Sequence, residues 1–515
     1  MKKNIASFLS LSLLLTSCNF PTPAPLPTPR PATTATATSV PTPTLPPDPL
    51  QLLWDDRSIF AEGLVESQQT VLDELPGATV YHLDFEIAAD LFHITGTEEV
   101  RYTNTETVVL DEVQFRLFPN ILGGEMTVGN LMADGQPVKP VYDLHNSLMR
   151  VPLAQPLQPG QSLVLKMEYA VTVPQSLDLN YGVLAYAEDV LALAHAYPMV
   201  CVFDDEGWNA EIPPQSGDVT YADASFYIVR VKAPAGLTLV TSGREVRRDG
   251  AGQVQVSIVA SGPARDFYLA ASPSWESVSQ TYGEVTINSY ALPESQDGAK
   301  LAMETASRAN DVFSKRYAPY TYTELDIVAT PTLALGIEYP GMVAIADRIY
   351  DVRGSYRGAP ASVYLETTVA HEVGHQWFYN LVGGDQLDDP WLDESLTQFA
   401  TLQYFTDEYG AEGVEGFRDS LEGRWASVGG AEIPIGLPVA AYDNAEYGAI
   451  VYGRGPLFFE ALREQIGPDA LDGFLGDYTV RFSWGIATPG MLQALAEEHC
   501  ACNLQPLFDE WVYPP

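Results

Sequence analysis

His371-Glu372-Val373-Gly374-His375 is the stretch of sequence that says most about how this chain folds. If the segment is helical, its two histidines lie on one face of the helix, with Cβ atoms about 5–6 Å apart. Two imidazoles at that spacing can bind one metal ion. Glu372 is offset from both histidines, so its carboxylate can lie beside a water molecule on the metal.

The surrounding sequence predicts two packed helices. Residues 362–370, before the histidines, are typical of a mostly buried helix, which Gly383-Gly384 ends. Asp389-Pro390 is a good N-cap and first-position pair for a second helix. This second helix carries Glu394 about one turn from its start, where an antiparallel partner can aim the carboxylate at the histidines.

We therefore expect one zinc ion bound by His371, His375 and Glu394 in a tetrahedral site whose fourth position holds water. Zinc lowers the pKa of its water from about 15.7 to about 7, and Glu372 is the expected base. The alternative is a surface helix with two solvated histidines, which the apolar flanks disfavour. The predicted chemistry is zinc-dependent hydrolysis of peptides.

The spacing from His375 to Glu394, within Trp391-Leu-Asp-Glu-Ser-Leu396, resembles the aminopeptidase N and leukotriene hydrolase family of zinc peptidases, the gluzincins. Leu335-Gly-Ile-Glu338-Tyr-Pro-Gly341 resembles the exopeptidase motif of that family. This resemblance implies that Glu338 binds the free α-ammonium group of the substrate.

Val451-Tyr452-Gly-Arg-Gly-Pro is similar to the family segment that bears a catalytic tyrosine, which implies that the Tyr452 hydroxyl stabilises the oxyanion. Tyr447 is the nearest alternative. Arg265-Asp-Phe-Tyr-Leu-Ala is similar to the end of the family's N-terminal β domain.

The similarity spans about residues 75–512 and implies an α+β multidomain fold. We expect an N-terminal antiparallel β-sandwich-like domain at residues 75–275. A thermolysin-like, mainly helical zinc peptidase domain with a small β-sheet follows at residues 285–515. Period-two alternation in segments such as Tyr81–Ile87 supports the β half, and a helical pattern begins at Lys300.

The sequence also departs from the family pattern. Tyr339 stands where Asn is usual, Asp393 and Ser395 flank Glu394 where Asn and Gly are common, and Arg454 replaces a lysine. The chain also stops soon after the catalytic region, so we expect no counterpart of the family's large helical C-terminal domain. These changes leave the metal ligands intact and bear on substrate preference.

The first eighteen residues predict an export signal, with two lysines followed by a short apolar run. Leu15-Thr-Ser-Cys18 resembles a bacterial lipobox, which predicts lipid attachment at Cys18; secretion without lipid is the alternative. Residues 19–49 are rich in Pro and Thr and predict a disordered, extended tether. We therefore expect an exported protein, lipid-anchored to the cell membrane, with an extracytoplasmic catalytic part.

The chain has 67 acidic and 27 basic residues, a net charge of −40, which disfavours nucleic acid as a partner. The expected partners are peptide substrates and, through the anchor, the membrane. With Cys18 lipidated, Cys201, Cys500 and Cys502 remain, and their pairing is left open. Four histidines occur singly and are expected to be structural: His82, His93, His145 and His195.

Two other functions remain open on the sequence. A thermolysin-type zinc endopeptidase has the same two histidines and a distant glutamate ligand, but the segment around Glu338 and the β-rich first half disfavour it. A non-catalytic surface lipoprotein with the same fold is disfavoured because all three ligands and Glu372 are present.

Overall fold

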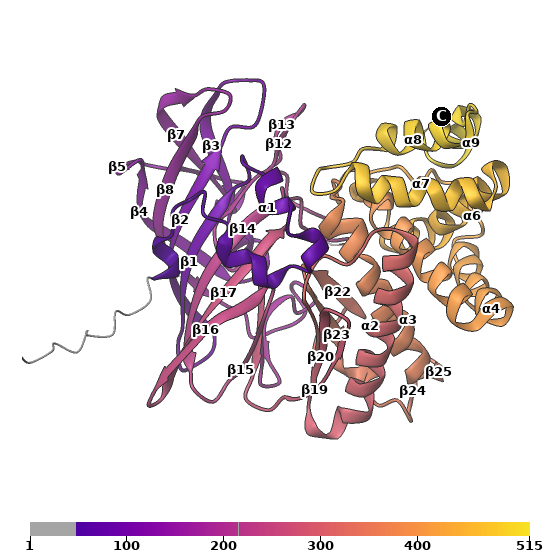
Figure 1. The fold of residues 1–515 in the computed structure, drawn as a ribbon, viewed down its shortest axis with the longest axis horizontal. Coiled ribbons are helices and arrows are strands. Elements are labelled where there is room, and N and C mark those ends of the chain that lie inside the picture. The colour runs from indigo at the N-terminus through magenta and orange to yellow at the C-terminus, as the bar shows by residue number, and fades with distance from the viewer. Residues whose placement is uncertain (1–47, 215, 515) are drawn as a thin grey trace, which may run out of the picture. The chain divides into compact units, whose positions relative to one another are not determined.

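The computed structural model describes residues 48–214 and 216–514. Strands dominate the first part of this chain and helices the second, in the labels of Figure 1. The predicted two-domain α+β fold is therefore confirmed. The predicted lipid site at Cys18 and nearly all of the tether lie outside the described residues. Within the described ranges, the helices are too short or too polar to cross a membrane.

The N-terminal domain is built around an eight-stranded sheet with two four-stranded sheets beside it. In spatial order the large sheet contains β16 (Arg244–Ala251), β17 (Val254–Ala264), β14 (Ser225–Pro234), β1 (Val80–Ile87), β2 (His93–Thr103), β8 (Ser162–Thr172), β4 (Glu125–Ala133) and β5 (Gln136–Pro137). The first smaller sheet contains β15 (Thr238–Thr241), β18 (Tyr268–Ser272), β10 (Val190–Ala194) and β9 (Leu184–Ala187). The second contains β11 (Met199–Val200), β3 (Leu110–Arg116), β7 (Leu148–Leu157) and β6 (Val141–Asp143).

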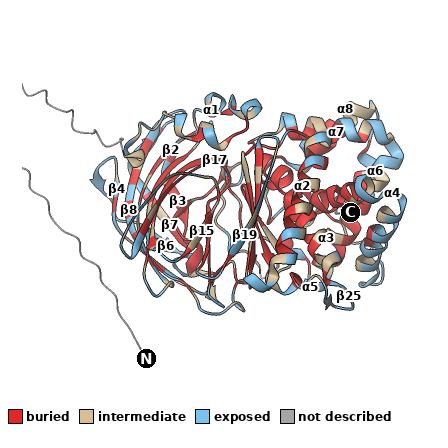
Figure 2. Cartoon of the chain, turned by 60° about the horizontal axis from the view of Figure 1, so that its bottom comes forward, coloured by how far each residue is buried: buried red, intermediate tan, exposed pale blue. Residues whose placement is uncertain are grey.

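Pairing in this domain is antiparallel with one exception among the described strands. β1 and β14 run parallel, with Val80 opposite Phe226. Parallel neighbours need a long connection, and the chain between these two strands supplies it by forming β2 to β13 (Gly207–Trp208) first. Alternating side chains face a common core, most regularly along β8, and Figure 2 shows buried residues following the strands.

The second domain places helices around a small mixed sheet. The sheet order is β19 (Glu276–Tyr282), β20 (Val285–Ala291), β21 (Glu324–Thr330), β23 (Met342–Ala346) and β22 (Gly336–Tyr339). The helices are α2 (Gln296–Arg316), α3 (Ala361–Gly374), α4 (Glu394–Ala426), α5 (Asn444–Ala449), α6 (Gly455–Ile466), α7 (Pro468–Arg481), α8 (Pro489–Cys500) and α9 (Gln505–Trp511). Strand β22 forms an edge of the sheet and contacts α3.

The start of α4 differs from the sequence prediction. Pro390–Leu392 forms a separate 3-10 turn, and the α-helix begins at Glu394 itself. Asp389 accepts a hydrogen bond from the Leu392 amide through its backbone carbonyl, 3.0 Å away, and its side chain caps nothing. Glu394 therefore lies at the helix end and not one turn inside it.

Arg265 ties the two domains together. Its buried guanidinium donates to the backbone carbonyls of Asn380 at 3.1 Å, Leu381 at 3.3 Å and Gly485 at 2.6 Å. The first two belong to the π-helical turn Gln376–Leu381, which directly follows α3. Carbonyls at a helix end lack partners within the helix, so a β-domain side chain supplies the missing donors.

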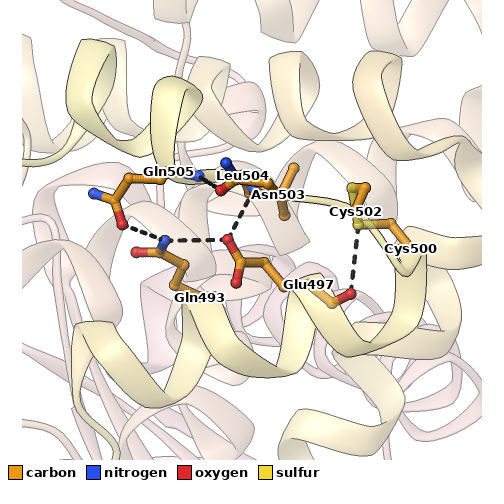
Figure 3. The surroundings of a disulfide bond; sticks show 7 residues. All are labelled: Gln493, Glu497, Cys500, Cys502, Asn503, Leu504 and Gln505. Atoms are coloured by element: carbon orange, nitrogen blue, oxygen red, sulfur yellow. Dashed lines mark hydrogen bonds between the residues drawn. A yellow bond between two sulfur atoms is a disulfide. The ribbon is translucent and has the colours of Figure 1, made fainter.

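Cys500 and Cys502 form a disulfide at the end of α8 (Figure 3). Cys201 is buried and free. Nearby, the carboxylate of Glu497 accepts a hydrogen bond from the Leu504 amide at 2.8 Å, which joins α8 to the turn before α9 (Figure 3). This pairing answers the question that the sequence left open.

Glu98 on β2 is a buried acid in the core of the β domain. It is 0% exposed, in phase with the inward-facing Ile94 and Val100, and neither carboxyl oxygen has a hydrogen-bond partner among the described residues. Burial raises the pKa of Glu98 well above its usual range. The neutral acid is therefore the form that the folded protein favours.

Replacing Glu98 with Gln should make stability less sensitive to pH. The pKa of Glu98 in the folded protein is raised above the unfolded value of 4.5, so its contribution to the free energy of unfolding of the wild type is fully present below pH 4.5. It is lost as the pH rises toward the folded pKa. Between pH 4.5 and 7, the free energy of unfolding of the variant should rise by about 1–3 kcal/mol relative to that of the wild type.

Urea unfolding of both proteins with chelator present, from pH 4 to 8, measures this difference. Glu99→Gln, on the opposite face of the same strand, is the control and should leave the pH dependence nearly unchanged. A stability gap for Glu98→Gln that does not vary with pH would contradict the assignment.

Candidate metal centre

The three predicted ligands lie together. His371 is on α3, His375 directly follows its last turn, and Glu394 is the first residue of α4. The Nε2 atoms of His371 and His375 are 3.2 Å apart. Glu394 Oε2 lies 3.2 Å from His371 Nε2 and 3.6 Å from His375 Nε2. All three side chains are buried.

These distances fit a zinc ion. Zinc bonds of about 2.0–2.1 Å in a tetrahedral arrangement place neighbouring ligand atoms about 3.3 Å apart. Burial lowers the pKa of His371 to about 4, which keeps the imidazole in the neutral form that binds metals. Burial alone would raise the pKa of Glu394, but hydrogen bonds from the two histidines outweigh it and lower that pKa well below the usual value.

Asp393 orients the second histidine. Its Oδ1 lies 2.6 Å from His375 Nδ1, and Gln386 Nε2 donates to its other oxygen. Thr397 Oγ1 is 3.2 Å from the same Nδ1. A carboxylate on the far nitrogen of a ligating histidine fixes the ring orientation and tautomer. In the sequence, Asp393 stands out only as a departure from the family pattern; its position next to Glu394 was the available signal.

Glu372 reaches the same cavity from α3. Its carboxylate lies against β22, where a Cβ atom added at Gly336 would be 2.3 Å from Glu372 Oε1. Glycine at that position therefore makes room for the carboxylate. Burial raises the pKa of Glu372 well above its usual range, which strengthens it as a proton acceptor.

Tyr452 lies in the π-helical turn Ile450–Arg454, and its hydroxyl donates to Glu394 Oε1. Its ring centre is 6.0 Å from that of His371 and 5.7 Å from that of Tyr447. Burial raises the pKa of Tyr452, so its hydroxyl keeps the proton it donates. Among the described tyrosines, Tyr452 is the one whose hydroxyl forms a hydrogen bond with a predicted metal ligand, Glu394.

Two residues that depart from the family pattern, Ser395 and Arg454, stabilise this turn. Ser395 Oγ donates to the carbonyl of Val451 at 2.7 Å. The guanidinium of Arg454 donates to the carbonyls of Ile433 at 3.0 Å and Trp511 at 2.8 Å. The polar side chains that replace the family's usual residues therefore anchor the segment that carries Tyr452.

Glu338 lies on the edge strand β22 with its carboxylate buried, and it accepts a hydrogen bond from Gln386 Nε2 at 3.2 Å. Burial, and next the carboxylate of Asp218, raise the pKa of Glu338. Asp218 comes from the loop before β14, so the β domain adds a second acid, which the sequence did not predict. The next residue, Tyr339, stacks on Tyr268 of β18 with ring centres 3.7 Å apart.

One cavity of about 1470 Å³ is lined by the three ligands and by Glu372, Tyr452, Glu338 and Asp218. In the β domain, residues 178–181, 183, 212–214 and 216–220 line this cavity. Side chains of α3 and α4 form other parts of its wall. Exposed apolar side chains on the wall include Leu179, Leu333 and Val363. Pockets for small ligands are typically about 300–1,000 Å³, so this cavity has room for several residues of a peptide.

The other five histidines do not join the three ligands; His499, for example, has its Nε2 2.9 Å from Asp477 Oδ2. His82 stacks on Trp54, His93 pairs with Asp90, and His145 lies in a turn with positive φ. His195 also lines the cavity, with Nε2 held 2.9 Å from Asp266 Oδ2.

Comparisons with known proteins agree with this site. Residues 301–511 match the family model described as the peptidase family M1 domain. Aminopeptidase M1 of Arabidopsis thaliana is 27% identical over 243 residues, 44% of this chain and 26% of the relative. Endoplasmic reticulum aminopeptidase 1 of Rattus norvegicus is 23% identical over 437 residues, 79% of this chain and 44% of the relative. The chain thus spans less than half the length of these curated relatives.

Solved structures share the fold over most of the chain. An M1 zinc metallopeptidase variant from Deinococcus radiodurans, bound to a Tyr-Ser-Ala substrate, superposes with a TM-score of 0.59 at 20% identity, covering 85% of this chain and 95% of that one. A two-domain M1 zinc metallopeptidase variant bound to L-arginine gives a TM-score of 0.60 at 19% identity, covering 85% and 94%. Residues 301–511 therefore form a domain of the M1 peptidase family, and the fold of the described chain is that of two-domain M1 zinc metallopeptidases.

Proposed function

We propose that this protein is a zinc-dependent aminopeptidase that removes residues from the N-termini of extracellular peptides. The observation that carries the proposal is the arrangement in one cavity of a His371–His375–Glu394 triad, the Glu372 carboxylate and the buried carboxylate of Glu338. The M1 relatives named above support it, since they are aminopeptidases by name and one structure holds a tripeptide substrate.

Each residue has a role in this proposal. Zinc held by the triad would supply a Lewis acid and a water molecule of lowered pKa. Glu372 removes a proton from the attacking water and passes it to the leaving amine. The Tyr452 hydroxyl donates a hydrogen bond to the oxygen on which negative charge develops.

Glu338 sets the register of the substrate. Together with Asp218 it makes an acidic end of the cavity that an α-ammonium group would neutralise. A peptide held by its free amine then presents its first peptide bond to the metal centre. The export and lipid anchor at Cys18 rest on the sequence alone and stay predictions.

A comparison of free and blocked peptides tests this function. The wild-type enzyme should cleave free-amine fluorogenic peptides at least about 100-fold faster than their N-acetylated forms, because a blocked amine forms no charged contact with Glu338. A chelator should abolish both activities, and Glu338→Gln should reduce the preference. Efficient cleavage of N-acetylated peptides would instead support the thermolysin-type endopeptidase, and no zinc-dependent turnover of any peptide would support the non-catalytic binding protein.

Replacing Glu372 with Gln should separate metal binding from catalysis. Because Glu372 is not a ligand, bound zinc should stay near one ion per chain while kcat falls by about 10²–10⁴-fold. Metal analysis and steady-state kinetics measure both quantities. His371→Ala is the control and should lose the zinc itself; normal turnover in the Gln variant would refute the role as base.

Replacing each tyrosine with Phe should distinguish Tyr452 from Tyr447. Loss of an oxyanion donor typically costs about 2.7–4 kcal/mol, so kcat should fall about 100-fold or more in Tyr452→Phe. Tyr447→Phe is the matched control and should change kcat less than tenfold. A larger effect at Tyr447 would transfer the role to that residue.

A further inference from the structure

Arg424 is a basic residue in an acidic cavity, and the role assigned to it below rests on the proposed aminopeptidase function. Arg424 is on α4 and lines the cavity, half-buried. It is the only Lys or Arg among the described residues of the cavity wall. Seven acidic residues share that wall: Asp178, Asp218, Glu338, Glu366, Glu372, Glu394 and Glu412.

The guanidinium of Arg424 has no acceptor for its hydrogen bonds in the described part of the chain. Arg418, on the same helix, pairs with Glu460 at 3.0 Å and Glu422 at 3.3 Å, and Arg454 donates to three carbonyls. Burial lowers the pKa of Arg424, an effect that Tyr452 and then Glu394 partly offset. A half-buried cation without an acceptor is costly, and an anionic ligand would remove that cost.

Arg424 lies beside the reacting groups. Its guanidinium carbon is 6.0 Å from the centre of the Tyr452 ring. Helix α4 packs closely against the turn that carries Tyr452, since a Cβ atom at Gly453 would be 3.0 Å from Arg424 Cβ. An extended peptide advances about 3.3–3.6 Å per residue, so Arg424 is within reach of the first or second residue after the cleaved bond.

We propose that Arg424 binds the C-terminal carboxylate of the substrate and makes the enzyme selective for dipeptides and tripeptides with both termini free. Glu338 and Asp218 then receive the ammonium group at one part of the cavity, and Arg424 receives the carboxylate beyond Tyr452. A guanidinium can bind a carboxylate through two parallel hydrogen bonds, which an amide cannot accept in the same way. The substrate class follows from these opposite charges in the one cavity that also holds the metal ligands.

Peptide acids and their C-terminal amides test the proposal with the full-length zinc enzyme. For a dipeptide and a tripeptide, wild-type kcat/KM should be about 10- to 100-fold higher for the acid than for the amide. The chain length with the larger ratio identifies which residue meets Arg424. Arg424→Met should remove the preference, so that its acid-to-amide ratio of kcat/KM falls to about 1; an amino acid p-nitroanilide, which has no carboxylate, is the reference substrate for each variant.

Two further variants complete the test. Arg418→Met is the matched control and should keep the wild-type preference. Arg424→Lys keeps a point charge and should keep part of it. Equal rates on acids and amides in the wild type, or an unchanged preference in Arg424→Met with normal zinc content, would overturn the inference. Absence of turnover on every free-amine substrate, including the p-nitroanilide, would instead overturn the proposed aminopeptidase function.

Discussion

The close contact between helices α3 and α4 at Gly374 determines the geometry of the metal centre. A Cβ atom at Gly374 would lie 2.9 Å from Thr397 Cγ2, so any larger residue would push the helices apart. The same Thr397 has its hydroxyl 3.2 Å from His375 Nδ1. The glycine between the two histidines therefore sets how close Glu394 comes to them, and with it the three ligand distances.

The β domain takes part in the site as well as supporting it. Arg265 supplies hydrogen-bond donors to the turn that ends the α3 segment, and Asp266 accepts a hydrogen bond from Tyr379 of the same turn at 3.0 Å. Asp218 adds an acid to the cavity wall. Movement between the domains would therefore change both the position of the histidines and the volume open to a peptide.

The sequence predicted those parts of the site that depend on short-range spacing. His371, His375 and Glu372 follow from helix periodicity, and Glu394 from its predicted place about one turn into the next helix, although that helix in fact begins at Glu394. Asp218 and Arg424 were not found, because residues that are distant in the sequence meet only when the chain has folded. For the same reason, the alternation along β1 predicted a strand but not its parallel pairing with β14.

The disulfide at the end of α8 encloses a single intervening residue. Loop-closure entropy gives a crosslink of that span about 1–2 kcal/mol, compared with about 4.7 kcal/mol for one that closes a hundred residues. It restrains the local turn far more than the chain as a whole. Reduction of this disulfide would therefore leave the overall fold intact. Its formation after folding would restrain only the turn that follows α8.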